Sequence, residues 1–218
     1  MVQPATITFL KQLAKNNNKP WFDEHRKEYE TAKTDFENVI TSLLDKMRVI
    51  DPAFADQKAK DCIFRIYRDV RFSKDKTPYK AHFSAAFSRS GKKDMAAGYY
   101  LHLEPGKVFV GGGIWMPENE HLKKIRQEID YNFDDFKKIV NAAAFKKMFG
   151  KVEGEQLKKA PQGYADDNPA LEYLKMKSYT VGHKLEDKQL TDKGFEAQCV
   201  KVFSTMKPLV DFINNALV

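Results

Sequence analysis

Two segments of alternating residues, joined by a Pro-Gly pair, constrain the fold of this chain more than any other feature. They read GYYLHLE (98–104) and KVFVGGGIW (107–115), and Pro105-Gly106 between them is typical of a tight turn. Alternation gives the first segment two faces, with Tyr99, Leu101 and Leu103 on one and Tyr100, His102 and Glu104 on the other. The sequence therefore predicts a β-hairpin here.

Helical periodicity is found on both sides of this hairpin. Before it, residues 6–15 and 21–47 are predicted to form helices, and after it residues 133–149 and a last helix from Asp192 onward. The clearest apolar stripe belongs to the second of these and consists of Phe36, Ile40, Leu43, Leu44 and Met47. Each of these segments needs a partner surface for its apolar face.

The order of the elements indicates the fold class. Additional strands are predicted over residues 62–72, 81–88 and 178–185. Helices followed by a run of strands and then mostly helices favour an α+β fold, in which an antiparallel sheet with a hairpin is packed by N-terminal and C-terminal helices. The chain has no internal repeat and no low-complexity linker, so we expect residues 1–218 to form a single domain.

Positive charge is concentrated in one part of the chain. The net charge is +7, but residues 58–93 alone contain eleven Lys or Arg and only three acids, a local balance of +8. The remainder is therefore almost neutral. Such a concentration favours a local anion-binding site over a uniformly basic surface.

The centre of this region reads RIYRDVRFSKDKTPYK (65–80) and is predicted to be a strand followed by a turn. Arginine binds carboxylate or phosphate through two parallel hydrogen bonds, because its guanidinium is planar. We therefore expect a pocket for a small anionic ligand that bears phosphate or carboxylate. Its candidate ligand-binding residues are Arg65, Arg68, Arg71, Lys76 and Tyr79.

Two further residues are candidates for acid–base chemistry. Asp69 is flanked by cations, which favour its ionised form and suit it to orienting an arginine or acting as a base. His82 follows the cationic run, and a positive field lowers the pKa of a histidine and keeps it neutral. Asp69 and His82 are thus the candidate catalytic residues. His82, Arg26 and Arg89 could join the cationic pocket only through the tertiary fold. The sequence does not distinguish binding from turnover.

The same residues allow two alternatives. Asp69 and Asp75 could neutralise the arginines in an ion-pair network, as in an interaction or scaffold protein without a ligand. A nucleic-acid-binding module is the other alternative, since aromatic residues are interleaved with the cations and could stack on bases. These aromatic residues are Tyr67, Phe72, Tyr79 and Phe83. Residue types alone leave both alternatives open. The sequence does not indicate an oligomeric state.

No cofactor or metal is indicated by a local motif. Gly111–Gly113 lacks the spacing of a dinucleotide or phosphate loop and favours a bulge or the close approach of another backbone, and Trp115 beyond it is expected in the core. No two of the five histidines are spaced as a metal-binding pair. Cys62 and Cys199 lie far apart in the sequence and are expected to be buried, reduced thiols.

Membrane and export signals are also lacking in the sequence. No stretch approaches the ~20 apolar residues of a membrane-spanning helix. The N-terminal residues lack the basic start, apolar core and cleavage site of a secretory signal. We therefore expect a cytoplasmic protein without a membrane partner.

Residues 65–80 resemble the R-x-x-R-D-x-R-F…[D/N]-K-x-x-Y signature of a widespread family of bacterial conserved hypothetical proteins of unknown function. The matching residues are Arg65, Arg68, Asp69, Arg71, Phe72, Asp75, Lys76 and Tyr79. Residues 16–30, the hairpin and residues 160–175 resemble its other blocks, so the resemblance spans nearly the whole chain. It supports a single domain with a functional pocket and implies no particular chemistry.

Overall fold

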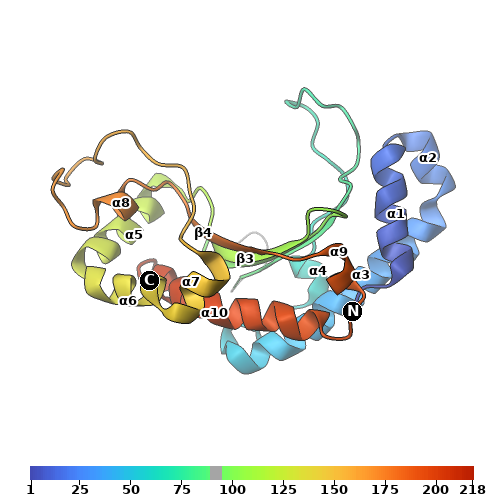
Figure 1. Ribbon diagram of the computed structural model, residues 1–218. Helices are drawn as coiled ribbons and strands as arrows, with labels where there is room; N and C mark the ends of the chain where they lie inside the picture. Colours follow the sequence, from blue (N-terminus) through green and yellow to red (C-terminus); the bar gives the residue numbers. More distant parts are fainter. Residues whose placement is uncertain (89–94) are drawn as a thin grey trace. The chain divides into compact units, whose positions relative to one another are not determined.

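The computed structural model describes residues 1–88 and 95–218 (Figure 1). Contacts group the described residues into two compact units. The first unit draws on residues 1–93, 100–110 and 184–201, and the second on 94–99, 111–183 and 202–218. Several strands and the last helix contain residues of both units, so the units are not simple successive segments. The single domain expected from the sequence stays a prediction.

The N-terminal helices belong to the first unit. They are α1 (Pro4–Lys15), α2 (Lys19–Glu24), α3 (Arg26–Ile50), the 3-10 helix η1 (Pro52–Phe54) and α4 (Ala59–Cys62). One helix was predicted over 21–47, but it is divided at His25. The His25 ring stacks on Trp21 with 4.1 Å between centroids, and His25 Nδ1 lies 2.9 Å from the Trp21 carbonyl oxygen. The backbone leaves helical geometry at His25, whose ψ is 27°, so α2 ends before α3 begins.

The remaining helices follow the hairpin. They are α5 (Asn119–Tyr131), α6 (Phe133–Asn141), α7 (Ala143–Phe149), α8 (Leu171–Leu174), α9 (Asp187–Leu190) and α10 (Phe195–Asn215). Among the described helices, none combines the length and apolar character needed to cross a bilayer. The cytoplasmic location stays a prediction.

Four strands form one antiparallel sheet, so the α+β fold class is confirmed. Their order is β1 (Phe83–Phe87), β2 (Gly98–Leu103), β3 (Phe109–Ile114) and β4 (Tyr179–Lys184). The predicted hairpin is β2–β3. Burial in β2 alternates as predicted, with Tyr99, Leu101 and Leu103 buried and the intervening residues partly exposed.

Helices cover the sheet in each unit. In the first unit, Phe36 of α3 stacks on Phe83 of β1 with 5.3 Å between ring centroids. In the second unit, Phe203 of α10 packs edge-on against Tyr99 of β2 at 5.2 Å. Burial of such aromatic side chains is the main contribution to each core. Packing by N-terminal and C-terminal helices is therefore confirmed.

The glycines of β3 allow neighbouring strands to approach closely. A Cβ atom on Gly111 would lie 2.6 Å from the Val181 carbonyl oxygen of β4, and one on Gly112 would lie 2.5 Å from the Gly98 carbonyl oxygen of β2. The predicted close approach of another backbone is thus confirmed. The core position predicted for Trp115 is wrong, because its side chain is 79% exposed. The ladder ends at Ile114 and the chain turns at Met116, whose φ is +46°.

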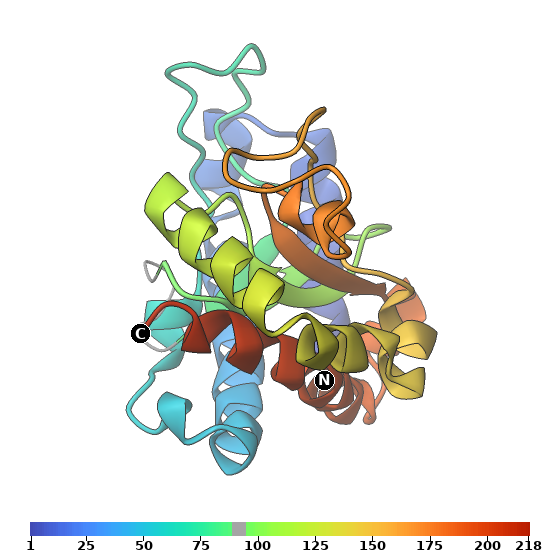
Figure 2. The ribbon, with the colours of Figure 1, turned by 90° about the vertical axis from the view of Figure 1, so that its left-hand side faces the viewer.

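Residues 65–80, which we name the basic loop, do not form the predicted strand. The strand predicted over 62–72 is wrong, since only the isolated bridges of Ile63 with Ala85 and of Tyr67 with Tyr79 are present in it. Local side-chain bonds compete with a strand ladder here, because Asp69 accepts from the Arg71 amide and Asp75 from the Thr77 amide. Figure 2 shows the loop extending past α1 and α2.

Candidate functional site

The base of the basic loop is fixed by hydrogen bonds and by aromatic packing. Asn17 Nδ2 donates to the Tyr79 carbonyl oxygen at 2.8 Å, and the Tyr79 amide donates back to Asn17 Oδ1 at 3.1 Å. The Tyr79 ring is 4% exposed and stacks on Phe22 with 4.0 Å between centroids. Tyr79 therefore anchors the loop in the core of the first unit.

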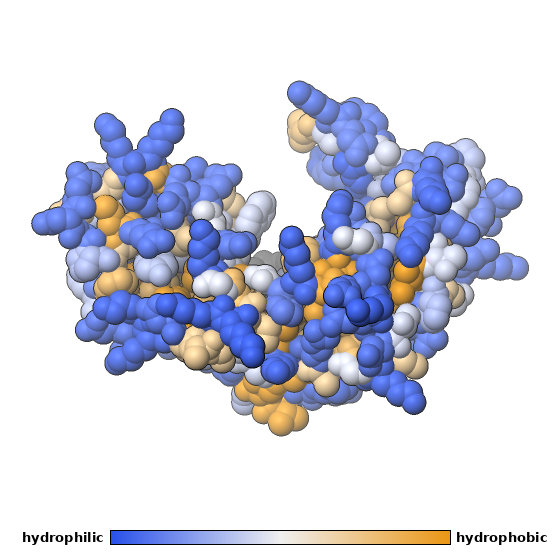
Figure 3. Space-filling view, viewed as in Figure 1, coloured by the Kyte–Doolittle hydropathy of each residue, from blue (hydrophilic) through white to orange (hydrophobic). Residues whose placement is uncertain are grey.

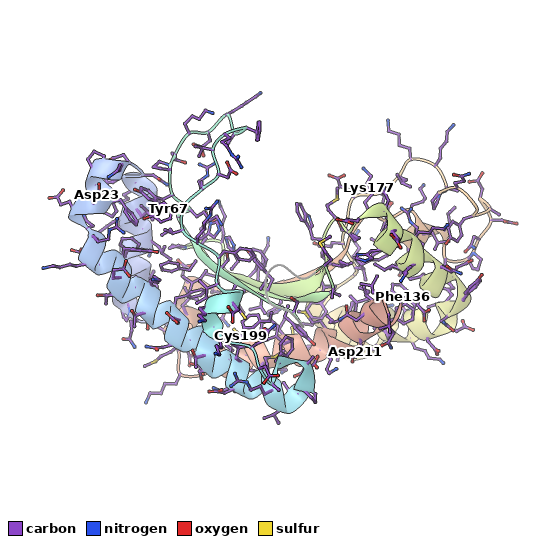
Figure 4. All side chains as sticks on the ribbon, turned by 180° about the vertical axis from the view of Figure 1, so that it is seen from behind. Asp23, Tyr67, Phe136, Lys177, Cys199 and Asp211 are labelled. Atoms are coloured by element: carbon purple, nitrogen blue, oxygen red, sulfur yellow. The ribbon has the colours of Figure 1, made fainter. Side chains whose placement is uncertain are left out.

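Tyr67 lies next to Tyr79 at this base, with 5.5 Å between ring centroids, and beside α2, whose Asp23 is also labelled in Figure 4. Its ring centroid is 6.1 Å from that of Phe22, and a hydrogen bond with Tyr67 raises the pKa of Arg26. The Arg26 guanidinium also lies 5.3 Å from the centroid of the Phe22 ring. The tertiary fold thus places Arg26 at the base of the loop.

Arg68 holds the interior of the loop together. Its Nη1 bonds Asp75 Oδ2 at 2.5 Å and the Thr77 carbonyl oxygen at 3.1 Å, and it also bonds the Thr77 hydroxyl. Its Nη2 lies 3.4 Å from Ser73 Oγ. Hydrogen bonds to the Thr77 amide and hydroxyl and to Arg68 lower the pKa of Asp75. Most donors of Arg68 are therefore occupied within the loop.

Arg71 and Lys76 also have partners inside the loop. Arg71 Nε and Nη2 bond the two oxygens of Asp69 at 2.9 and 2.6 Å, and this pairing lowers the pKa of Asp69. Lys76 Nζ donates to the Val70 carbonyl oxygen at 3.0 Å. The Phe72 side chain is 95% exposed at the tip, which Figure 3 shows as mainly hydrophilic. Two of the three arginines are thus held by the two acids of the loop.

Arg65 and Lys80 differ from the other cations of the loop. Within residues 1–88 and 95–218, neither has a carboxylate at ion-pair distance. Lys80 Nζ lies 5.4 Å from the centroid of the Phe64 ring, and burial together with the nearby Arg65 lowers the pKa of Lys80. Arg89, Lys92 and Lys93 lie outside the described residues. Among the described residues, these two cations at the base of the loop therefore lie close together without a carboxylate at ion-pair distance.

A second group of polar side chains, which we name the histidine cluster, lies next to Lys80. It consists of His82, Tyr100, His102, Glu104 and Lys107. Tyr100 Oη is 3.1 Å from His102 Nδ1, His102 Nε2 is 3.0 Å from Glu104 Oε2, and Lys107 Nζ is 2.8 Å from Glu104 Oε1. The His82 ring lies over that of His102, with 4.2 Å between centroids. All five residues belong to the first unit.

The cluster is partly buried, and burial changes the protonation of its members. Burial and the neighbouring His102 lower the pKa of His82 to about 4, against the opposing effect of Glu104. Burial raises the pKa of Tyr100. Burial also acts to raise the pKa of Glu104, but hydrogen bonds from Lys107 and His102 bring it below its usual value. His82 is therefore neutral near pH 7.

The predicted site residues are thus divided between two places. Arg68, Arg71, Lys76 and Asp69 make their contacts within the loop, Arg65 is at its base, and Tyr79 is in the core. His82 lies immediately before β1, next to His102. Their roles in ligand binding or catalysis stay predictions.

The sequence did not single out His102 and Glu104. Alternation in the first hairpin strand had placed them with Tyr100 on one face, which the hydrogen bonds confirm. Among the residues that the structure describes, one group of three side chains could hold a metal ion. It is formed by His82, His102 and Glu104, whose ligand atoms all lie within 4.8 Å of one another.

The two cysteines lie in the interior of the protein. Both are buried thiols, as predicted, and neither forms a disulfide. Burial raises the pKa of Cys199 to about 12, so the thiol stays protonated. The thiolate is the form that reacts or binds metal.

Comparison with known proteins gives a family for this chain. The family model described as conserved hypothetical protein (DUF2461) matches residues 5–212. The chain belongs to this family. A search of curated proteins and a search of solved structures each gave no significant match. Membership confirms the resemblance to a family of unknown function and leaves the chemistry to be argued from the site.

Proposed function

We propose that the protein binds a small anionic ligand, bearing phosphate or carboxylate, at Arg65 and Lys80 beside the histidine cluster. The observation that carries the proposal is the pair of adjacent cations without a carboxylate partner among the described residues. Like charges held close together repel each other, and more strongly where water is partly excluded. A bound anion would relieve this repulsion.

The surroundings of the pair suit such a ligand. Arg65 offers a planar guanidinium for bidentate binding, and Lys80 adds a compact charge over the Phe64 ring. Lys107 belongs to the adjacent cluster and adds a third cation, paired with Glu104. His82, which is neutral at pH 7, belongs to the adjacent cluster and stays the candidate acid–base residue for this ligand. Arg68, Arg71, Lys76 and Tyr79 then shape the loop that carries Arg65.

The test is calorimetric titration with inorganic phosphate, citrate and a nucleoside monophosphate. Loss of one charge-assisted hydrogen bond costs about 1.5–3 kcal/mol, so Arg65→Ala and Lys80→Ala should each weaken binding by about 10- to 100-fold. Lys74→Ala is the matched control, since Lys74 is an exposed lysine of the same loop. Equal losses in all three variants, or no binding by the wild type at millimolar anion, would overturn the proposal.

A nucleic-acid-binding surface is the second candidate, and the exposure of Phe72 favours it. Its ring is 95% exposed and lies 5.9 Å from the Arg71 guanidinium carbon. An exposed aromatic ring with adjacent cations is typical of single-strand binding by stacking. Tyr79 and Phe83, by contrast, are only 4% and 3% exposed, so they do not add to this surface.

This candidate predicts binding of single-stranded oligonucleotides that weakens steeply with salt. Stacking contributes about 1–3 kcal/mol per base, so Phe72→Ala should weaken binding by about 5- to 100-fold in fluorescence anisotropy. Trp115→Ala is the control, because Trp115 is also exposed but lies in the second unit. Binding that is absent at low salt, or insensitive to Phe72→Ala, would eliminate this candidate.

A further inference from the structure

Two imidazoles and one carboxylate meet in the histidine cluster. His82 immediately precedes β1, while His102 and Glu104 lie two residues apart at the end of β2. One ligand atom of each residue lies within 4.8 Å of those of the other two. Two histidines and a carboxylate form the protein donor set of many catalytic zinc sites and of non-haem iron sites.

The distances within this group suit a metal ion of that size. Metal–ligand bonds of about 2.0–2.2 Å in a tetrahedral site place neighbouring ligand atoms roughly 3.3 Å apart. His102 Nε2 and Glu104 Oε2 are already 3.0 Å apart. His82 has no hydrogen-bond partner for its ring among residues 1–88 and 95–218, so its side chain can rotate without breaking such a bond. To reach the spacing of a tetrahedral site, its ring nitrogen needs to move toward the other two ligand atoms by no more than about 1.5 Å.

Two of the three ligands, His102 and Glu104, are oriented by hydrogen bonds with neighbouring side chains that would not bind the metal. Tyr100 Oη lies 3.1 Å from His102 Nδ1, and a hydrogen on Nδ1 would leave Nε2 free to bind a metal. Lys107 bonds Glu104 Oε1 at 2.8 Å, which leaves Oε2 directed at His102. Hydrogen bonding to the far side of each ligand is the usual arrangement in metal sites.

We propose that His82, His102 and Glu104 bind a divalent transition-metal ion of the Zn²⁺ class, with a fourth coordination position open. Neither Arg65 nor Lys80 is a ligand in this arrangement, so the metal site does not depend on the proposed anion site. An anion bound at Arg65 and Lys80 could also occupy the open position. The alternative is a metal-free chain of hydrogen bonds through Tyr100, His102 and Glu104.

The experiment titrates chelator-treated, full-length protein with Zn²⁺ in a calorimeter and with Co²⁺ in an absorption spectrometer. The expected result is one ion per chain with micromolar or tighter affinity and the visible absorption of tetrahedral Co²⁺. His82→Ala and His102→Ala each remove a metal ligand. Each should therefore weaken Zn²⁺ binding by more than 10- to 100-fold, which is the loss typical of mutating a residue that only hydrogen-bonds a ligand. Tyr100→Phe removes only a hydrogen bond to a ligand, so it should weaken Zn²⁺ binding by about 10- to 100-fold.

His183→Ala is the matched control, because His183 belongs to the second unit and contacts the Met148 carbonyl oxygen. It should bind Zn²⁺ as the wild type does. Glu104→Gln is the alternative ligand variant if a histidine variant does not fold, as judged by circular dichroism. No binding by the wild type, or equal losses in His82→Ala and His183→Ala, would overturn the metal site. Loss of anion binding in Arg65→Ala with unchanged Zn²⁺ affinity would separate the two proposals.

Discussion

The basic loop and the histidine cluster both gather ionisable side chains in the first unit, but they differ in what those side chains contact. In the loop, Arg68 and Arg71 are paired with Asp75 and Asp69 through local bonds. In the cluster, His82 has no hydrogen-bond partner for its ring among the described residues, while its neighbours are bonded in a row. The cations of the loop are thus bonded mainly within it, whereas one imidazole of the cluster makes no hydrogen bond to a described residue.

This difference teaches that a dense run of charge can satisfy most of its own cations. A surface ion pair contributes little and needs no ligand, so the paired arginines are accounted for by the loop itself. The cations at its base, Arg65 and Lys80, have no such partner among the described residues, and Lys80 lies next to the cluster. The following changes test this contrast, from the largest expected effect to the smallest.

Tyr79→Ala should have the largest effect, because it removes the ring that anchors the loop in the core. Truncation of a buried aromatic side chain costs about 3–5 kcal/mol of unfolding free energy. Phe72→Ala, at an exposed position of the same loop, should change stability by less than about 0.5 kcal/mol. Urea unfolding measures both. Equal losses would contradict the view that the loop has an anchored base and a free tip.

Arg68→Gln should have the next largest effect. It removes bonds to Asp75, Thr77 and Ser73 from a side chain that is only 24% exposed. Hydrogen bonds of a charged group contribute about 1.5–3 kcal/mol, so a loss of about 1–3 kcal/mol is expected. Arg71→Gln is the control, since its pair with Asp69 is exposed, and it should have little effect. If both variants are as stable as the wild type, the loop is not held by its ion pairs.

Tyr100→Phe tests the cluster in the same way. It removes the hydroxyl that contacts His102 Nδ1 and leaves the ring in place. Loss of one such hydrogen bond should cost about 0.5–1.5 kcal/mol in metal-free protein. Tyr131→Phe is the control, because Tyr131 is 74% exposed, and it should be neutral. A neutral Tyr100→Phe would show that the row of hydrogen bonds does not order the cluster.

How much could be predicted from the sequence depended on the range of the interactions. The faces of β2 followed from alternation, and the cover of helices followed from apolar stripes such as that of α3. The strand predicted over 62–72 failed because Asp69 and Asp75 bond nearby amides, which a count of β-branched and aromatic residues does not register. The contact of His82 with His102 depends on the pairing of β1 with β2, which no local spacing encodes.

The pH dependence of the loop should be the smallest effect, and it identifies which carboxylate holds Arg68. Hydrogen bonds from Thr77 and Arg68 lower the pKa of Asp75 below its ordinary value of 3.8. A carboxyl group with a lowered pKa in the folded state stabilises the fold above its unfolded pKa. That contribution is lost as the pH falls through the folded value, so the wild type should lose stability below about pH 4.

Asp75→Asn isolates this contribution. The difference in unfolding free energy between wild type and Asp75→Asn should be constant from pH 7 to about pH 5 and should shrink as Asp75 of the wild type is protonated. The stability difference between wild type and Asp69→Asn should shrink in the same way at low pH, because pairing with Arg71 also lowers the pKa of Asp69. When Arg68→Gln is already present, the loss of unfolding free energy caused by Asp75→Asn should become smaller. The loss caused by Asp69→Asn should not change. If Arg68→Gln changes the losses of Asp75→Asn and Asp69→Asn equally, the two ion pairs are coupled. The loop would then be one network rather than two independent pairs.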